Sequence, residues 1–263
     1  MGWKAIARSA LGTSHESQEI PCQDYGDDRI FNDVIVGAVA DGAGSAKYAD
    51  LGANLAVKTT LKYLSKISEY LRKRQRCWER FSHALSETEA KKLFTKTVEK
   101  VIKELDEQAI KKDYSVNELA CTILVFVATP HWIAAMQIGD GFIVVRSQNS
   151  EEYQLLFHPD RGEFANETTF ITSANALQEM QVKVIAGEQA FICASTDGLE
   201  KVAIRLHDWK PFPPFFKPFE EYLQETPNPK EDHKYLDDFL NSERLNARTD
   251  DDKTLLLCLW ERE

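Results

Sequence analysis

The chain has 263 residues, of which 43% are hydrophobic, so it can bury a core within one domain. Its 42 acidic against 32 basic residues give a formal net charge of −10, which disfavours nucleic acid as a partner, because affinity for a phosphate backbone comes from lysine and arginine. Five cysteines without paired spacing predict reduced thiols and a cytoplasmic protein, and no apolar run reaches the roughly 18 residues of a membrane span.

Seven runs of the sequence are typical of β-strands, because they are rich in β-branched or large apolar residues and are bounded by Gly, Asp or Pro. In chain order they span residues 3–12, 33–41, 120–128, 132–146, 153–158, 189–198 and 252–260. A protein with this many strands is not a helical bundle.

Two stretches between the second and third strand place apolar residues at helical spacing, with charged residues on the other side. These apolar positions are Val57, Leu61, Leu64 and Leu71, and then Phe94, Val98, Val101, Ile102 and Leu105. Because the two helices follow one another instead of alternating with strands, a doubly wound parallel sheet is disfavoured. The order favours an α+β fold in which layered antiparallel sheets have helices outside.

Two segments interrupt this pattern. Residues 209–229 contain six of the nine prolines and several aromatic residues, which predicts a loop held to the core by its rings and argues against a regular helix. Residues 158–172 lie between strand candidates, where a reduced flap over a site is expected. A further amphipathic helix is indicated downstream by Tyr235, Leu236, Phe239 and Leu240.

Acidic residues stand at the ends of the apolar strands. Asp41, Asp140 and Asp197 each follow a strand, and Asp251 comes just before the last one. A single Asp-Gly pair at a strand end is most often a hairpin turn. If the strand ends meet at one edge, however, several carboxylates lie close together, and their repulsion is costly unless a cation neutralises it. Oxygen ligands without His or Cys select Mg²⁺ or Mn²⁺ over zinc.

Other site motifs fit less well. The stretch "DGAGS" is too short for a nucleotide-phosphate loop, and no Lys-Ser/Thr pair follows it. The stretch "TDDDKT" lacks the ligand spacing and the terminal Glu of a calcium loop. A Ser-His-Asp triad has no G-x-S-x-G turn to support it.

The order of the acidic fragments resembles, across nearly the whole chain, the PPM family of metal-dependent Ser/Thr phosphatases (protein phosphatase 2C). The fragments are "PCQDY", "VADGAGS", "ACTILVFV", "QIGDG", "STDGL" and "TDDDKTLLL". Details such as "GTSH" and "FANETTFIT" look most like the small stand-alone, PphC-like bacterial branch. The resemblance implies one domain over residues 1–263, a four-layer αββα sandwich, and a metal site at one end between the sheets.

The resemblance also implies roles for the acids. Asp41 matches the carboxylate that bridges two metal ions, and the carbonyl of Gly42 matches a ligand of the second ion. Asp197 and Asp251 match acids that complete the shell of the first ion, and Asp24 matches an acid that acts through metal-bound water. The expected cofactor is two Mn²⁺ or Mg²⁺ ions, and the expected reaction is attack on phospho-Ser/Thr by a bridging hydroxide.

A weaker third metal is expected at Asp140, but Lys201 stands where the family pattern has another acid. This departure leaves the third site one carboxylate short.

Other departures affect phosphate binding and proton transfer. Ala43 stands where many members have a histidine that protonates the leaving group. The family's phosphate-binding arginine falls on Glu19, so His15 or Arg161 is a substitute, with His15 a catalytic candidate. The implied partners are phosphorylated proteins, a Ser/Thr kinase and its targets, with neither nucleic acid nor membrane. The alternative function is a catalytically silent adaptor for a kinase or stress-response partner.

Overall fold

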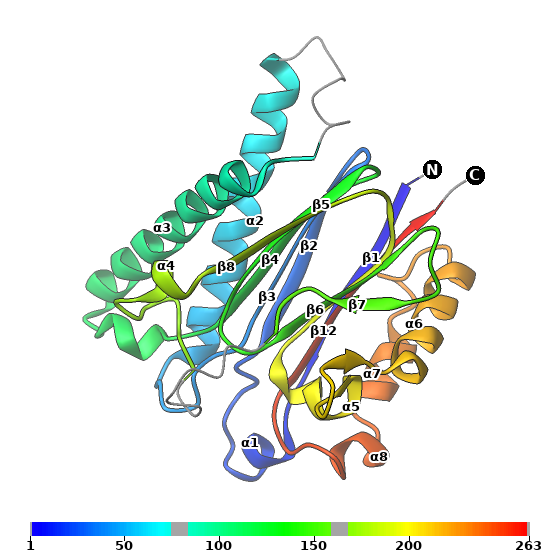
Figure 1. Cartoon of the computed structure of the whole chain (residues 1–263). Helices are drawn as coiled ribbons and strands as arrows, with labels where there is room; N and C mark the ends of the chain where they lie inside the picture. Colours follow the sequence, from blue (N-terminus) through cyan, green and yellow to red (C-terminus); the bar gives the residue numbers. More distant parts are fainter. Residues whose placement is uncertain (1, 75–83, 159–167, 262–263) are drawn as a thin grey trace.

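The structure, a computed structural model, describes residues 2–74, 84–158 and 168–261 (Figure 1). The expected site residue Arg161 lies outside these ranges, as does most of the expected flap at 158–172. None of the helices in these ranges is long and apolar enough to cross a membrane.

Two five-stranded antiparallel sheets form the centre of the protein. The first has the order β1-β12-β9-β6-β7 and consists of β1 (Gly2–Ala10), β12 (Lys253–Glu261), β9 (Gln189–Ser195), β6 (Phe142–Ser147) and β7 (Tyr153–Leu155). The second has the order β2-β3-β4-β5-β8 and consists of β2 (Tyr25–Phe31), β3 (Val34–Ala40), β4 (Ile123–Thr129), β5 (Trp132–Ile138) and β8 (Gln181–Ala186). A small separate ribbon pairs β10 (Ile204–Arg205) with β11 (Lys210–Pro211).

Helices lie outside the two sheets, and the longest ones cover the outer faces of the sheets. They are α1 (Thr13–Ser17), α2 (Ala49–Arg74), α3 (Glu87–Lys112), α4 (Ala176–Glu179), α5 (Glu200–Ala203), α6 (Pro213–Glu225), α7 (Lys234–Leu240) and α8 (Glu243–Asn246), with the 3₁₀ turns η2 (Val116–Leu119) and η3 (Asp197–Leu199). The long pair α2 and α3 lies against the second sheet, and α6 and α7 lie against the first (Figure 1). This is the four-layer αββα sandwich that the resemblance implied.

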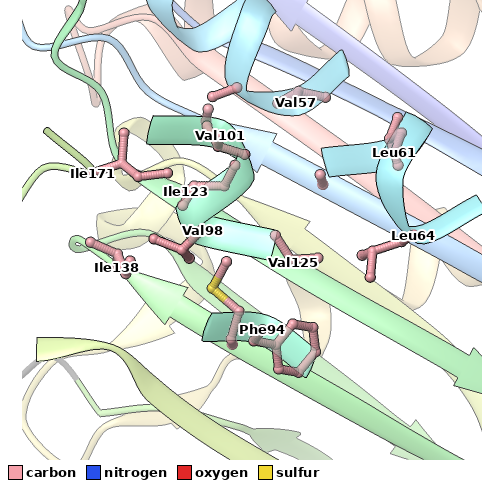
Figure 2. Close-up of a cluster of buried hydrophobic side chains, with 14 of the residues drawn as sticks. Val57, Leu61, Leu64, Phe94, Val98, Val101, Ile123, Val125, Ile138 and Ile171 are labelled. Atoms are coloured by element: carbon pink, nitrogen blue, oxygen red, sulfur yellow. The ribbon is translucent and has the colours of Figure 1, made fainter. Parts of the chain in front are cut away.

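The helix α3 shows how local sequence and packing agree. Ser86 forms a capping box with Glu89, in which the Ser86 hydroxyl accepts the Glu89 amide at 3.2 Å and the Glu89 carboxylate accepts the Ser86 amide at 2.9 Å. At the other end Asp113 takes the left-handed conformation, with φ of 59°. The face between these caps buries Phe94 and Val98 against α2 and the sheet, as their spacing predicts (Figure 2).

Between the sheets lies a second apolar layer, formed by alternate residues of both inner faces. Its largest fully buried members include Phe126 and Ile35, and it also contains Ile143, Ile192 and Leu256. Burying each side chain of this size contributes about 1.5–3 kcal/mol. This apolar layer therefore holds the inner faces of the two sheets together.

The seven predicted strands are confirmed, with two refinements. The run 132–146 is two strands, β5 and β6, which lie in different sheets and are joined through residues 139–141. The strands β2 and β8 were not predicted. In β2 the sequence "GDDR" hides the alternation, because Asp28 is buried and is paired with Lys230 at 2.9 Å.

The prediction of an irregular loop over residues 209–229 is wrong, because residues 213–225 form α6. Pro213 and Pro214 occupy the first turn, where amide groups have no acceptor within the helix, and Pro218 lies on the exposed face. The buried stripe consists of Phe215, Phe216, Phe219, Tyr222 and Leu223. Burying these side chains outweighs the roughly 3 kcal/mol cost of one interior proline.

Candidate metal centre

The strand register brings several strand ends to one edge of the sandwich. In the second sheet, Tyr25 at the start of β2 pairs with Ala40 at the end of β3. In the first sheet, Ser195 at the end of β9 pairs with Phe142 on one side and Leu255 on the other. The acids adjoining these ends are Asp24, Asp41, Asp140, Asp197 and Asp251. We call this edge the carboxylate edge.

Three carboxylates meet there. Oxygen atoms of Asp41, Asp140 and Asp197 all lie within 4.8 Å of one another. Their positions are fixed by hydroxyl groups: Thr122 accepts the Asp41 amide at 3.0 Å, and Thr168 donates to Asp140 at 2.7 Å. The convergence of strand-end acids that the sequence predicted is therefore present for these three residues.

Asp24 lies beneath this group and is 5% exposed. Its Oδ2 accepts a hydrogen bond from the Thr196 hydroxyl at 2.6 Å, and its Oδ1 is buried with no hydrogen-bond donor in reach among the described residues. A buried carboxylate oxygen without a donor is costly. Asp24 thus has one buried carboxylate oxygen that no hydrogen bond among the described residues satisfies.

The carboxylates hold protons more tightly than usual. Burial raises the pKa of Asp24 to about 8 and that of Asp197 to about 7 from an ordinary 3.8. Burial and then the charges of Asp24 and Asp197 raise the pKa of Asp41 well above its ordinary value, with a further contribution from Asp251. The cause is the burial of several negative charges close to one another. An all-oxygen donor set in this state fits a hard divalent cation.

Asp251 lies at the rim of the carboxylate edge and does not belong to the close group of three. Its side chain is exposed, and its Oδ1 accepts the amide of Asp252 at 2.8 Å. Its charge still acts on the group, because it contributes to the raised pKa of Asp197. Asp251 is therefore near the group of three carboxylates but on its solvent side.

The neighbouring Asp252 was missed by the sequence reasoning. Its side chain is 2% exposed and accepts the amides of Gly12 at 2.7 Å and Gln23 at 2.6 Å, while the Nδ1 of His15 lies 3.0 Å from Oδ2. Asp252 thus ties the N-terminal loop, which carries Asp24, to the start of β12. The sequence has three consecutive aspartates at 250–252, and nothing in it indicates which of the three is buried.

Two glycines allow the loop at residues 250–252 to lie close to the backbone of neighbouring segments. A Cβ on Gly12 would lie 2.4 Å from the backbone carbon of Asp251, and a Cβ on Gly198 would lie 2.0 Å from the backbone oxygen of Asp252. Any side chain at either position would push the 250–252 loop outward. The chain following β9 and the chain preceding β12 are therefore in backbone contact at the carboxylate edge.

The remaining candidates lie as follows. Gly42 is buried, and its amide donates to the carbonyl of Gln23 at 3.1 Å. Ala43 is buried and brings no titratable group to the edge. Glu19 is exposed and has a φ of 57°. Lys201 is exposed on α5, so its ammonium group reaches solvent.

Comparisons with known proteins agree with this geometry. A family model described as protein phosphatase 2C matches residues 11–241. Serine/threonine-protein phosphatase 3 from Escherichia coli (strain K12) is 35% identical over 267 residues, covering 99% of both chains.

Solved structures show the same fold at low identity. A serine/threonine phosphatase from S. agalactiae has a TM-score of 0.60 at 16% identity and covers 98% of this chain and 100% of its own. Stp1 from Staphylococcus aureus, a serine/threonine phosphatase, has a TM-score of 0.58 at 12% identity and covers 98% and 95%. RsbX, solved in complex with magnesium, has a TM-score of 0.56 at 14% identity and covers 98% and 96%.

Proposed function

The chain belongs to the protein phosphatase 2C family and is a protein serine/threonine phosphatase, and from this premise we propose that it works with two divalent cations, Mn²⁺ or Mg²⁺, held at the carboxylate edge. The observation that carries the proposal is the group of Asp41, Asp140 and Asp197, whose carboxylate oxygens lie within 4.8 Å of one another. Divalent cations in such a site activate water as a nucleophile and neutralise charge on the phosphoryl group.

The ligand set would come from both sheets. Asp41 and the carbonyl of Gly42 would contribute from the end of β3, while Asp197 would contribute from the end of β9 and Asp251 from the start of β12. Asp24 would act through a water molecule, because its Oδ1 is buried without a donor while Oδ2 is occupied by Thr196. Asp140 would provide a weaker third position.

The chain's own side chains orient this set. Thr196 accepts the amide of Thr254 at 3.0 Å and donates to Asp24, so it links β12 to the acid that lies deepest in the site. His15 directs Nδ1 at the buried carboxylate of Asp252, which leaves Nε2 as the ring atom able to reach other groups. We propose that Nε2 contacts the substrate phosphate in place of the family's arginine, since Glu19 is anionic.

The substrates of the enzyme are phosphorylated proteins, and we propose that a Ser/Thr kinase produces them. The alternative function, a silent adaptor, has no support. The relative that is 35% identical is named a phosphatase, and Asp41, Asp140 and Asp197 are all present and close together. Clustered carboxylates without a cation reduce stability, so their retention favours catalysis.

The test is hydrolysis of p-nitrophenyl phosphate in EDTA and then in Mn²⁺ or Mg²⁺. We expect no turnover in EDTA and recovery when the metal is restored. His15→Gln should raise KM for the phosphate ester more than it lowers kcat, because the expected role is phosphate binding. Equal turnover in EDTA would contradict the metal-dependent mechanism.

A further inference from the structure

A groove of about 930 Å³ lies in the helical layer that covers the first sheet. Its walls come from α5, the start of α6, α7, α8 and the segment that follows α5 (Figure 1). These elements are on the opposite side of the sandwich from α2 and α3. The cavity is separate from the carboxylate edge, whose aspartates are not among its lining residues.

The groove is lined by large apolar side chains that are exposed, whereas most such side chains of the protein are buried. Leu206, Phe212 and Tyr235 line it and are 40%, 42% and 43% exposed. They are three of the five large hydrophobic side chains that are exposed in the described ranges. Large apolar side chains gathered in one concave surface are typical of a binding site for a protein segment.

The rim of the groove is positively charged. Lys201, Arg205, Arg244 and Arg248 line it, and no aspartate or glutamate does. Arg205 is also paired with Asp208 outside the lining at 3.1 Å, whereas Lys201, Arg244 and Arg248 form no ion pair with another described residue. In a chain of net charge −10, this local excess of cations favours an acidic occupant.

The groove adjoins the catalytic end of the protein. Lys201 comes four residues after Asp197, across η3 and the start of α5. On the other wall, Arg248 comes three residues before Asp251. Each wall of the groove is therefore joined to the carboxylate edge by three or four residues of chain.

We propose that this groove docks an acidic segment of the phosphoprotein substrate, which places aliphatic or aromatic side chains against Phe212 and Leu206 and carboxylates against the basic rim. This inference rests on the proposed function only in taking a phosphoprotein as the binding partner. Docking itself requires no metal ion. Recognition away from the phosphorylated residue selects among phosphoproteins that present the same phosphoamino acid.

The experiment measures docking without turnover. A fluorescein-labelled, unphosphorylated peptide rich in Glu and containing Leu and Phe is titrated with the full chain in EDTA, and fluorescence anisotropy gives Kd. A matched peptide carries Gln in place of Glu. We expect the acidic peptide to bind at least about fivefold more tightly, and added NaCl to weaken its binding.

Two variants address the charge and the apolar surface separately. Arg244→Glu reverses one rim charge and should weaken binding about fivefold or more. Phe212→Ser removes one exposed ring at the N-cap of α6, where serine is a favourable residue, so the fold should be retained. The matched control is Lys217→Glu, the same kind of charge reversal at an exposed position of α6 outside the groove.

The outcomes separate the inference from the metal-dependent mechanism. Equal Kd for the two peptides, or an effect of Lys217→Glu as large as that of Arg244→Glu, would overturn docking. A wild-type dimer that Phe212→Ser converts to monomer would also overturn it, because the occupant would then be a second copy. Loss of metal dependence on p-nitrophenyl phosphate with intact peptide binding would contradict the proposed mechanism alone.

Discussion

Replacing Asp252 with asparagine should destabilise the protein and weaken its metal site together. The carboxylate is 2% exposed and accepts two backbone amides, from Gly12 at 2.7 Å and from Gln23 at 2.6 Å. Asparagine has one oxygen, so its NH₂ group would face one of these amides. The loss of a charge-assisted hydrogen bond costs about 1.5–3 kcal/mol, and leaving a buried amide without an acceptor costs about 1–3 kcal/mol.

These contributions overlap, because one amide is lost in both, so we expect Asp252→Asn to lower the free energy of unfolding by about 2–4 kcal/mol. For a protein of this size the melting temperature should fall by roughly 5–15 °C. Circular dichroism melts in EDTA measure this change. Titrations of p-nitrophenyl phosphatase activity with Mn²⁺ should show weaker metal activation, because the loops that carry Asp24 and Asp251 are no longer tied together.

The matched control is Asp250→Asn, which changes an exposed neighbour in the same loop. The backbone oxygen of Asp250 accepts hydrogen bonds from Ser14, and asparagine retains that oxygen. The control should therefore remain within about 0.5 kcal/mol of the wild type. The reasoning is refuted if Asp252→Asn melts within about 1 °C of the wild type and responds to Mn²⁺ in the same way.

Four further predictions concern the metal centre and the core. Asp41→Asn should lose most of kcat at saturating Mn²⁺, because the role proposed for Asp41 is that of an anionic ligand shared by two ions; wild-type kcat would mean that Asp41 serves only as a turn residue. Because folding raises the pKa of Asp24 to about 8 and of Asp197 to about 7, the native state binds more protons than the unfolded state, so in EDTA the melting temperature should fall as pH rises from about 4 to about 8. Saturating Mn²⁺ should offset that fall, and a metal-free protein that melts higher at pH 8 than at pH 6 would contradict the pKa shifts. Calorimetry should show two Mn²⁺ binding events in the wild type, with a weak additional event in Lys201→Asp; a distinct third event in the wild type would contradict the incomplete third site. Phe216→Ala, at a fully buried position of α6, should lower the free energy of unfolding by about 3–5 kcal/mol, whereas exposed Lys217→Ala should change it little when both are measured by urea denaturation.

The acids of the site could be predicted from the sequence because of where they stand in the strands. Asp41, Asp140 and Asp197 each follow an apolar run, and the antiparallel register places those ends together. The hydroxyl partners Thr122 and Thr196 gave no such signal. Their bonds depend on how strands distant in the sequence lie side by side, which period-two patterns do not encode.

Two other features were beyond pattern reasoning for physical reasons. The strand β2 buries Asp28 through an ion pair with Lys230, from a segment 202 positions away in the chain, so its sequence looks polar. In α6, a local rule about proline was outweighed by tertiary burial of aromatic rings, which only the packed sheet provides. In both cases the stabilising partner lies far away in sequence.

The origin of the carboxylate edge in both sheets has a consequence for refolding. Asp41 follows a strand of the second sheet, Asp197 follows a strand of the first, and Asp140 lies on the link between β5 and β6 that passes from one sheet to the other. Neither half of the sandwich carries a complete set of acids. After dilution from denaturant, a molecule therefore regains hydrolysis only once its two sheets have associated. The time course of recovered activity follows this late, long-range step and not the early formation of helices.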